Sequence, residues 1–453
     1  MFRDLPTYAE MTTNSFWSTR TPAHWAVRPG LAVLQENRRQ NIGLIETQVL
    51  SLSYGRVVVK PIEKQHGLAP HSYEGYQVLE PGDIVVRPTD LQNDQTSLRV
   101  GQVKDRGIIT SAYIGLRPTG DWDGTYAYQY LTVVDSTKRI YGMGSGLRQQ
   151  LGWADVKRMP CLVPPGGEQR AIAKYLDHAN ARISKTITAK LRLIDLLKER
   201  RGVLIDDLIF GVGADLRDSG IPWLGEVPAS WEVASARHTF KAVNRVPVGN
   251  EPRLSVTQAS GLVRTEDMLE RSTQAQDVGR FQRCEPEDMV LNKYKAHLGV
   301  FWGASEPGLI TPNYTVFRQV RPISTRYFEL LFRSRRYLQG FREIVYGVTD
   351  GMSPLYLKDF YRLPLLSPPL SEQEAIVRRA QALTAEMQHV IGKLTREISL
   401  LQEFRTRLVA DVVTGQVDVR AIAASLPDTL EQDTELDSLL DDDLEDVLGG
   451  GEG

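Results

Sequence analysis

Five loop segments of this sequence combine arginine, lysine, amide, hydroxyl and aromatic side chains, which are the groups that can read the edges of nucleic-acid bases. Arg and Lys pair with guanine, Asn and Gln pair with adenine, and the remaining basic groups bind phosphates. Solvated loops have a similar composition, so each segment alone is weak evidence. The residues that we predict to contact DNA are Tyr54, Arg56, Arg87, Thr89, Asn93, Ser145, Arg148, Asn292, Lys293, Tyr294, Lys295, Thr349 and Ser353.

The sequence contains no motif typical of a catalytic or metal site. It has neither the phosphate loop G-x-x-x-x-G-K-[ST] nor the zinc motif H-E-x-x-H, and no Asn-Pro-Pro-Tyr or Asp-Pro-Pro-Tyr segment of the kind used in base methylation. Residues 285–288, with Lys293 and Lys295, could form a nuclease cluster, but a turn that enters a strand is the favoured interpretation. We therefore predict that this chain has no catalytic residues, no bound metal and no cofactor of its own.

A long internal repeat is the strongest feature of the sequence. Residues 158–172 recur at 362–376, and the same offset holds without a gap as far as Gly211 and Gly415. A period this long indicates two complete units in tandem rather than a solenoid of short repeats. In each unit the region before the repeated segment is rich in predicted strands, and we expect strands at 48–53, 56–59, 83–86 and 130–134.

Each strand-rich front is followed by a proline-free stretch in which apolar residues recur every three or four positions, as in a coiled coil. Pro-Pro pairs at 164–165 and 368–369 predict the starts of two long helices, and Gly211 and Gly415 predict their ends. We expect the two helices to pair within the chain; pairing between the subunits of a homodimer is the alternative. The predicted interface residues are Ile183, Ile187, Ile194, Leu197, Leu394, Ile398 and Leu401.

The order of the elements predicts the direction of the helices. A front domain follows the first helix and must lead into the start of the second. If the second front domain lies at the far end of the first helix, the second helix runs back antiparallel to it. The two front domains would then be related by a pseudo-two-fold axis, an arrangement that suits a two-sided target.

The net charge of −2 conceals a basic body and an acidic C-terminal segment. All 54 Lys and Arg residues precede position 421, whereas eleven of the 56 acids follow Arg420, so residues 1–420 carry a net charge of +9. This modest excess is compatible with a polyanionic partner. The two cysteines fit a reducing compartment, and we find neither a signal peptide nor a membrane span, so we expect a cytoplasmic location.

Taken together, these motifs resemble the specificity (S, HsdS) subunit of type I restriction-modification systems. The resemblance is carried by the repeated lead-in Pro-Pro-x-x-Glu-Gln-x-x-Ile at 164–172 and 368–376, by the long helix after each, and by residues 221–231. It also includes residues 87–90 and 107–113, and it covers about residues 14 to 420.

The resemblance implies an α+β fold with two tandem mixed α/β target-recognition domains separated by two long antiparallel helices that form an intramolecular coiled coil. The implied domains are target-recognition domain 1 (1–163), a long helix (164–212), target-recognition domain 2 (213–367) and a second long helix (368–420). Residues 421–453 would be an acidic, disordered tail outside the family pattern.

The function implied by the resemblance is non-catalytic. Each target-recognition domain would read one half of a split sequence in double-stranded DNA, and the helices would dock two modification (methyltransferase) subunits. Two restriction (translocase-nuclease) subunits would complete the nuclease, and S-adenosylmethionine, ATP and Mg would belong to these partners. The alternative hypothesis is a two-headed adaptor or scaffold protein that does not bind nucleic acid.

Overall fold

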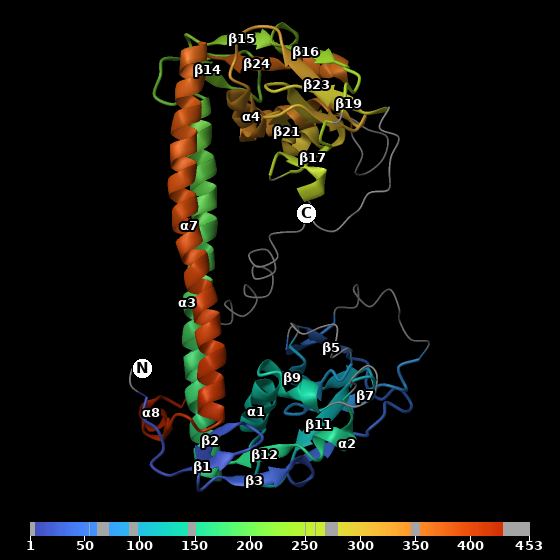
Figure 1. The fold of residues 1–453 in the computed structure, drawn as a ribbon, viewed down its shortest axis with the longest axis vertical. Coiled ribbons are helices and arrows are strands. Elements are labelled where there is room, and N and C mark those ends of the chain that lie inside the picture. Colours follow the sequence, from blue (N-terminus) through green and yellow to red (C-terminus); the bar gives the residue numbers. More distant parts are fainter. Residues whose placement is uncertain are drawn as a thin grey trace. The chain divides into compact units, whose positions relative to one another are not determined.

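A computed structural model of the chain describes residues 5–53, 55–60, 72–89, 98–143, 151–249, 251–258, 260–267, 280–345 and 354–428. The chain divides into two compact units (Figure 1). Unit 1 comprises Met1–Ala189 and Glu397–Asp437, and unit 2 comprises Lys190–Arg396 and Ser438–Gly453. Each unit contains a strand-rich front domain and a segment of each of two long helices.

The two front domains have the same strand topology. The strands of unit 1 are β1 Met11–Asn14, β2 Thr19–Pro22, β3 Ala26–Pro29, β4 Leu34–Glu36, β5 Leu50–Ser53, β6 Arg56–Val59, β7 Gln77–Leu79, β8 Ile84–Val86, β9 Val100–Gln102, β10 Gly107–Ile109, β11 Ile114–Pro118 and β12 Pro160–Val163. Those of unit 2 are β13 Leu216–Asp218, β14 Glu226–Pro228, β15 Glu232–Ser235, β16 Phe240–Val243, β17 Leu254–Val256, β18 Leu262–Arg264, β19 Gln282–Cys284, β20 Met289–Asn292, β21 Phe301–Gly303, β22 Gly308–Ile310, β23 Tyr314–Gln319 and β24 Pro364–Ser367.

Each front domain is built on an antiparallel four-stranded sheet, with the order β4-β11-β8-β9 in unit 1 and β16-β23-β20-β21 in unit 2. The two-stranded pairs also correspond: β1–β2 with β13–β14, β3–β12 with β15–β24, β5–β6 with β17–β18, and β7–β10 with β19–β22. In both units the strand that follows the first two-stranded pair, β3 or β15, pairs with the last strand of the domain, from Ala26 opposite Val163 and from Glu232 opposite Ser367. The repeat in the sequence is therefore a repeat of a complete fold.

Short helices complete the front domains. They are α1 Gly124–Ser136 and α2 Trp153–Val156 in unit 1, and α4 Thr325–Arg333, α5 Arg335–Ile344 and α6 Leu357–Arg362 in unit 2. The predicted strands at 48–53, 56–59 and 83–86 are confirmed as β5, β6 and β8. The predicted strand at 130–134 is wrong, because these residues belong to α1.

The sequence around α1 explains the error. The side chain of Asp123 accepts hydrogen bonds from the backbone N–H groups of Thr125 and Tyr126 at 3.0 and 3.1 Å, which caps a helix. Tyr126, Tyr130 and Val134 are buried at four-residue intervals, the spacing of one helix face. The apolar run that resembled a strand is the inner face of this helix.

Two helices of 44 residues, α3 Gly166–Ile209 and α7 Leu370–Val413, begin directly after the Pro-Pro pairs. Both end in the same left-handed glycine turn, since Gly211 and Gly415 have φ of +62° and +74°. After α7, the N–H of Gln416 donates to the carbonyl of Asp411 at 2.7 Å and the N–H of Gly415 donates to that of Val412 at 3.2 Å. This is a Schellman motif, and the predicted helix ends are confirmed.

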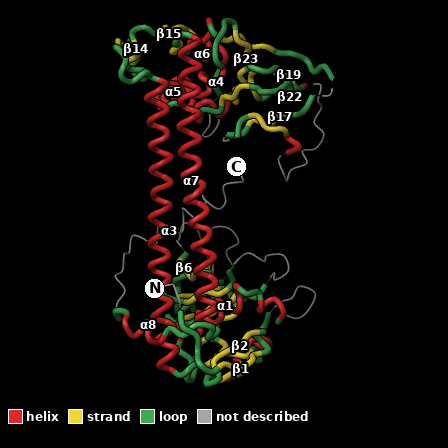
Figure 2. The backbone as a smooth tube through the Cα atoms, turned by 60° about the vertical axis from the view of Figure 1, so that its left-hand side comes forward, coloured by secondary structure: helices red, strands yellow, loops and turns green. Residues whose placement is uncertain are grey.

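Within each unit the two helices run side by side and antiparallel (Figures 1 and 2). In unit 1, residues from the start of α3 share one apolar core with residues from the end of α7, such as Ile172 with Val412. In unit 2, the end of α3 and the start of α7 share a core, as Ile209 does with Ile376. The helices therefore pair within one chain, as predicted.

The glutamate of each repeated lead-in joins a long helix to its front domain. Glu168, which is 5% exposed, accepts hydrogen bonds from the Tyr8 hydroxyl and from Trp25 Nε1 at 3.0 Å, and its other oxygen lies 2.9 Å from His24 Nε2. In unit 2, the equivalent glutamate of α7 accepts a hydrogen bond from Trp231 Nε1 at 3.0 Å. Glu168 is buried and its equivalent in unit 2 is exposed, but both carboxylates accept a hydrogen bond from the front domain, which fixes how the helix leaves it.

The glutamine that follows this glutamate makes a second contact between the long helix and the front domain in each unit. The side-chain oxygen of Gln169 accepts a bond from the backbone N–H of Asp123 at 2.7 Å, and its amide donates to the carbonyl of Pro164 at 2.8 Å. Gln373 repeats both bonds, with the N–H of Ser324 at 2.9 Å and with the first proline of its own pair at 2.8 Å. Both members of the Glu-Gln pair are thus structural.

A further helix, α8 Arg420–Ser425, follows α7 in unit 1. Ala423 is buried in the core of unit 1, and Lys174 of α3 forms an ion pair with Asp428 at 2.6 Å. The predicted disordered tail is therefore wrong for 421–428, because α8 buries apolar side chains against the unit. The remainder of that tail, 429–453, lies outside the described residues.

Gly415→Ala should destabilise the protein. A Cβ at this position would lie 2.3 Å from Pro22 Cδ, and the left-handed backbone costs an alanine about 1–2 kcal/mol before that clash. Gly392→Ala is the matched control, because that glycine lies inside α7 with nothing within 4 Å of the added Cβ, and the change should stabilise by about 0.5–1 kcal/mol. Urea unfolding of the two variants checks the prediction, which fails if both shift the midpoint in the same direction.

Candidate nucleic-acid interface

The central strands β8 of unit 1 and β20 of unit 2 each begin after a turn of the same kind, and a buried aspartate fixes each of these turns. Asp83 accepts two hydrogen bonds from the Arg117 guanidinium, at 2.7 and 2.9 Å, and Asp288 pairs in the same way with Arg245. Each aspartate also accepts the backbone N–H three residues earlier, at 2.9 and 2.7 Å. The segment around Asp288 is therefore a strand-entry turn, as predicted, because an arginine neutralises the carboxylate that a nuclease would need.

Beyond the other end of β8 and β20, one hydrogen bond in each unit links residues that lie in or beside the predicted DNA-contact segments. In unit 1, the N–H of Leu151 donates to the carbonyl of Pro88 at 3.1 Å. In unit 2, the N–H of Leu355 donates to the carbonyl of Lys293 at 2.9 Å. Pro88 lies in the predicted segment 87–93 and Lys293 in the predicted segment 292–297, whereas Leu151 and Leu355 come after the predicted segments 141–150 and 346–353. The same hydrogen bond thus occurs at equivalent positions in both units.

A hairpin adds a third segment to each surface. In unit 1, β5–β6 turns at Gly55, where an added Cβ would lie 2.9 Å from the side chain of Leu98, just before β9. In unit 2, β17–β18 packs on the corresponding strand β21, since Trp302 Nε1 donates to the carbonyl of Thr257 at 2.8 Å and the turn passes Gly261. We did not predict the turn at 257–261 as a DNA-contact segment. The signal that identifies it as a candidate is its position, which is equivalent to that of the β5–β6 turn in unit 1.

The structure describes seven of the thirteen predicted DNA-contact residues. Arg56 and Lys295 are exposed, Tyr294 is 39% exposed, and four others are half-buried, namely Arg87, Thr89, Asn292 and Lys293. The other six predicted residues lie outside the described residues: Tyr54, Asn93, Ser145, Arg148, Thr349 and Ser353.

In unit 2, a short 3-10 helix at Lys293–Leu298 presents the predicted residues. The side-chain oxygen of Asn292 accepts the N–H of Tyr294 at 3.1 Å and so caps this helix. Lys293 Nζ donates to the carbonyl of Pro312 at 3.4 Å. Tyr294 and Lys295 project from the helix into solvent, where a ring and an ammonium group can contact a nucleic acid.

In unit 1, a buried arginine that we did not predict supports the surface that carries the predicted DNA-contact residues of that unit. The side chain of Arg99 is fully buried and donates to the carbonyl of Thr89 at 2.5 Å, while its backbone N–H donates to Asp135 at 2.6 Å. Burial raises the pKa of Asp135, and the bond from the Arg99 N–H and the nearby Lys138 and Arg99 charges offset this only in part. Arg99 is a structural arginine, and no local sequence pattern distinguishes it from a DNA-contacting one.

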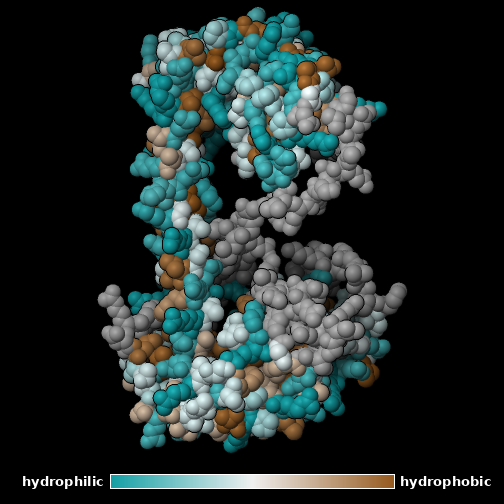
Figure 3. All heavy atoms as spheres, in the orientation of Figure 1, coloured by the Kyte–Doolittle hydropathy of each residue, from teal (hydrophilic) through white to brown (hydrophobic). Residues whose placement is uncertain are grey.

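The helix-interface residues lie on the inner face of the helices. Ile183, Ile187, Ile194 and Ile398 are at most 3% exposed, and Leu197, Leu394 and Leu401 are half-buried. Other apolar side chains of these helices lie in solvent, among them Leu193, Leu196, Val390, Leu400 and Phe404. Figure 3 shows apolar patches that interrupt the hydrophilic surface of the helices. No helix in the described part of the chain combines the length and apolarity needed to cross a membrane.

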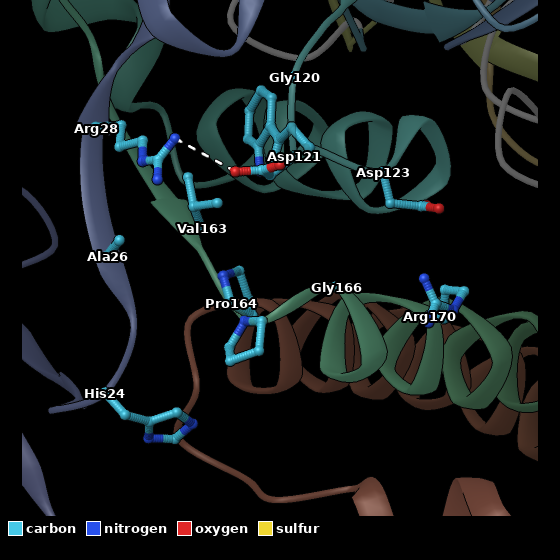
Figure 4. Close-up of a pocket in the computed structure, with 12 residues that line it drawn as sticks. His24, Ala26, Arg28, Gly120, Asp121, Asp123, Val163, Pro164, Gly166 and Arg170 are labelled. Carbon is cyan, nitrogen blue, oxygen red and sulfur yellow. Dashed lines mark ion pairs between the residues drawn. The ribbon is translucent and has the colours of Figure 1, made fainter.

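A polar hollow of about 580 Å³ lies where α3 leaves the front domain of unit 1 (Figure 4). An ion pair between Arg28 and Asp121 at 3.6 Å crosses part of it, Asp123 caps α1, and His24 is engaged by Glu168. Its acidic and imidazole groups are thus occupied by structural contacts. Among the described residues, no group of three His, Cys, Asp or Glu side chains could hold a metal ion.

No family model matches this chain, and a search of curated proteins also finds no match. Among solved structures, a chain of a type I R-M system is 13% identical to this chain, with a TM-score of 0.63. The similarity covers 88% of this chain and 100% of the other, whose structure was solved to explain complex assembly and conformational transition. The HsdS subunit from Thermoanaerobacter tengcongensis is 15% identical (88% and 99% covered, TM-score 0.47). The type I S subunit from M. genitalium is 14% identical (86% and 96% covered, TM-score 0.33).

The first of these similarities extends over most of this chain and the whole of the other. The predicted resemblance is therefore confirmed at the level of the fold, which is similar to that of a chain of a type I R-M system. The predicted α+β architecture, with two mixed front domains and two long antiparallel helices, is confirmed with it.

Arg99→Met should destabilise unit 1 by about 1–3 kcal/mol, because it removes a donor from the partly buried Thr89 carbonyl. Arg38→Met is the matched control in the same unit, since the side chain of Arg38 is 79% exposed and pairs only with nearby Glu36, and its cost should stay within about 0.5 kcal/mol. Denaturant unfolding measures both costs. Equal effects of the two changes would show that Arg99 does not support this surface.

Proposed function

We propose that this chain, which has the fold of type I specificity subunits, is the DNA-specificity subunit of a type I restriction-modification complex. Each front domain reads one half of a bipartite target in double-stranded DNA. The chain itself is not an enzyme, and the assembled complex methylates adenine in its target and cleaves DNA with ATP.

One observation carries this proposal: a single fold occurs twice and presents different side chains at the same surface. Equivalent hydrogen bonds, from Leu151 to Pro88 and from Leu355 to Lys293, occur beside the predicted DNA-contact segments of both units. The residues around them differ, with Arg87 and Thr89 in unit 1 and the Tyr294–Lys295 pair in unit 2. A protein that reads two unlike half-sites requires such a pair of equivalent supports with different contact residues.

The exposed apolar side chains of the helices support docking of the modification subunits. Leu196 of α3 is 57% exposed, and Leu193 is 44% exposed one turn earlier. Isolated apolar side chains on a surface are normal, but several along one helix pair mark an interaction surface. We propose that two modification subunits bind the helices and that two restriction subunits join them. S-adenosylmethionine, ATP and Mg belong to these partners.

Replacing the first front domain with a second copy of the other tests the proposal. Residues 232–367 can be grafted in place of 26–163, because each segment begins and ends at paired residues of equivalent strands. The grafted chain, expressed with the modification subunit of its own system, should direct methylation to a symmetric target that contains the second half-site twice. Mapping methylated bases in the host genome measures the outcome.

The unaltered chain in the same host is the control and should give an asymmetric target. If the grafted chain assembles but still directs methylation to the original target, the front domains do not read the sequence. Methylation by the graft with no sequence preference would equally contradict the proposal.

Leu196→Ser should weaken assembly with the modification subunit by about 10- to 100-fold, because burying a leucine side chain contributes about 1.5–3 kcal/mol. Leu216→Ser is the matched control, since this leucine of β13 belongs to the same unit, is 41% exposed and lies outside the helices. Titration of labelled modification subunit into each variant measures the affinity. Equal affinities of the two variants would contradict docking on this face of α3.

A further inference from the structure

A tryptophan of unit 2 supports the turn of the β17–β18 hairpin, which lies beside β21 (Figure 1). Trp302 of β21 donates its indole N–H to the carbonyl of Thr257 at 2.8 Å, and a Cβ built on Gly261 would lie 3.3 Å from its ring. The N–H and the hydroxyl of Thr257 both donate to the carbonyl of Gly261, at 2.9 and 3.0 Å. Both ends of this closed turn therefore contact one indole ring.

The same tryptophan is linked to the 3-10 helix that carries Tyr294, a predicted DNA-contact residue. The guanidinium carbon of Arg333 lies 3.3 Å from the centre of the Trp302 ring, and its Nη2 donates to the carbonyl of Phe301 at 3.0 Å. Arg333 also packs on Gly299, the residue that ends the 3-10 helix, because an added Cβ there would lie 3.0 Å from Arg333 Cγ. One stacked pair of side chains thus supports both the hairpin turn and the predicted DNA-contact segment of unit 2.

Unit 1 has a glycine at the position equivalent to the tryptophan. Gly101 of β9 pairs with Val85 of β8. In unit 2, Trp302 pairs with Val290 of the equivalent strand β20. A Cβ built on Gly101 would lie 2.5 Å from Leu52 Cδ1, so the β5–β6 hairpin packs directly on the strand. The two hairpins therefore have different supports, a bare backbone in unit 1 and an aromatic ring in unit 2.

The turn that the tryptophan supports presents an amide side chain to solvent. Gln258 and Ser260 are exposed, and no described residue forms a hydrogen bond with the Gln258 amide. The N–H of Ser260 donates to the hydroxyl of Thr257 at 3.0 Å, which fixes the turn further. The equivalent hairpin of unit 1 carries Tyr54 and Arg56, two of the predicted DNA-contact residues. A turn that is already fixed loses little conformational entropy on binding, which suits its exposed side chain to recognition.

We propose that Gln258 reads an adenine in the half-site bound by unit 2, and that Trp302 is the residue that positions it. The amide oxygen of a glutamine accepts a hydrogen bond from adenine N6, and its amide nitrogen donates to adenine N7. In the major groove this adjacent donor and acceptor identify adenine among the four bases. The inference rests on the proposed function and deepens it, since it assigns one base of the target to one side chain.

The test compares Gln258→Met with Gln381→Met in the full chain assembled with its modification subunit. Methionine keeps the length of the side chain and removes the amide. Gln258→Met should therefore weaken binding to the target duplex by roughly 5- to 100-fold, leave binding to a scrambled duplex unchanged, and relax one adenine position in the methylated sequence. Gln381→Met is the matched control, because this glutamine is exposed on α7 outside the front domain, and it should alter none of these quantities.

A double variant tests the positioning role of Trp302. Trp302→Leu removes the indole N–H and the ring beneath the turn, so it should relax the same adenine position. Adding Gln258→Met to Trp302→Leu should then cause almost no further loss of affinity, because a displaced amide no longer contacts the base. A purely structural tryptophan would leave the loss caused by Gln258→Met undiminished. Gln258→Met alone should not lower the thermal midpoint, so it tests the base contact even where Trp302→Leu unfolds the domain.

Two results would overturn the base contact while the unaltered complex still recognises a split target. The first is a half-site for unit 2 that contains no A·T pair, and the second is a Gln258→Met variant that keeps every adenine preference. If the unaltered complex recognises no DNA sequence at all, the proposed function falls as well. Mapping of methylated bases in the host genome, together with duplex titrations, distinguishes these outcomes.

Discussion

In each unit, one tryptophan attaches the front domain to the ends of the two long helices, and the rest of the structure depends on this contact. In unit 1, Trp25 donates its indole N–H to buried Glu168 at the start of α3, and its ring lies 3.0 Å from a Cβ built on Gly415 beyond the end of α7. Trp231 has the same two kinds of neighbour in unit 2. One aromatic side chain therefore fixes both helices to the domain, with a charge-assisted hydrogen bond on one side and close packing on the other.

This contact with the helices leaves the rest of each front domain free to vary in sequence. Strand β3, which directly follows Trp25, pairs with the last strand β12, and β15 pairs with β24 in the same way after Trp231, so the chain enters and leaves this part of the domain at one place. The predicted DNA-contact residues Arg87 and Lys293 follow β8 and β20, whose entry turns are held by the Asp83–Arg117 and Asp288–Arg245 pairs. These residues and the helix contacts lie in different parts of the sequence, and the two diverged front domains keep one strand order.

The features that the sequence predicted are those with a local or periodic signal. The repeat, the helix starts at Pro-Pro, the glycine ends and the antiparallel pairing follow from spacing and backbone chemistry, and three of four named strands were found. Residues 130–134 were assigned to the wrong element because a short apolar run fits a strand or a helix face, and the Asp123 cap decided it. Arg99 and α8 could not be predicted, since long-range burial gives them their roles.

The distribution of paired and unpaired cations says more about a polyanionic partner than the net charge does. Arg117 and Arg245 are bound to buried aspartates and are not available to a ligand, although both count toward the +9 of residues 1–420. Lys295 is exposed and has no carboxylate partner in the part of the chain that the structure describes. Only such groups gain a new interaction when a phosphate arrives, because a paired guanidinium must first give up its carboxylate. The affinity for DNA that we propose therefore depends on where such cations lie, and Lys295 lies among the predicted DNA-contact residues.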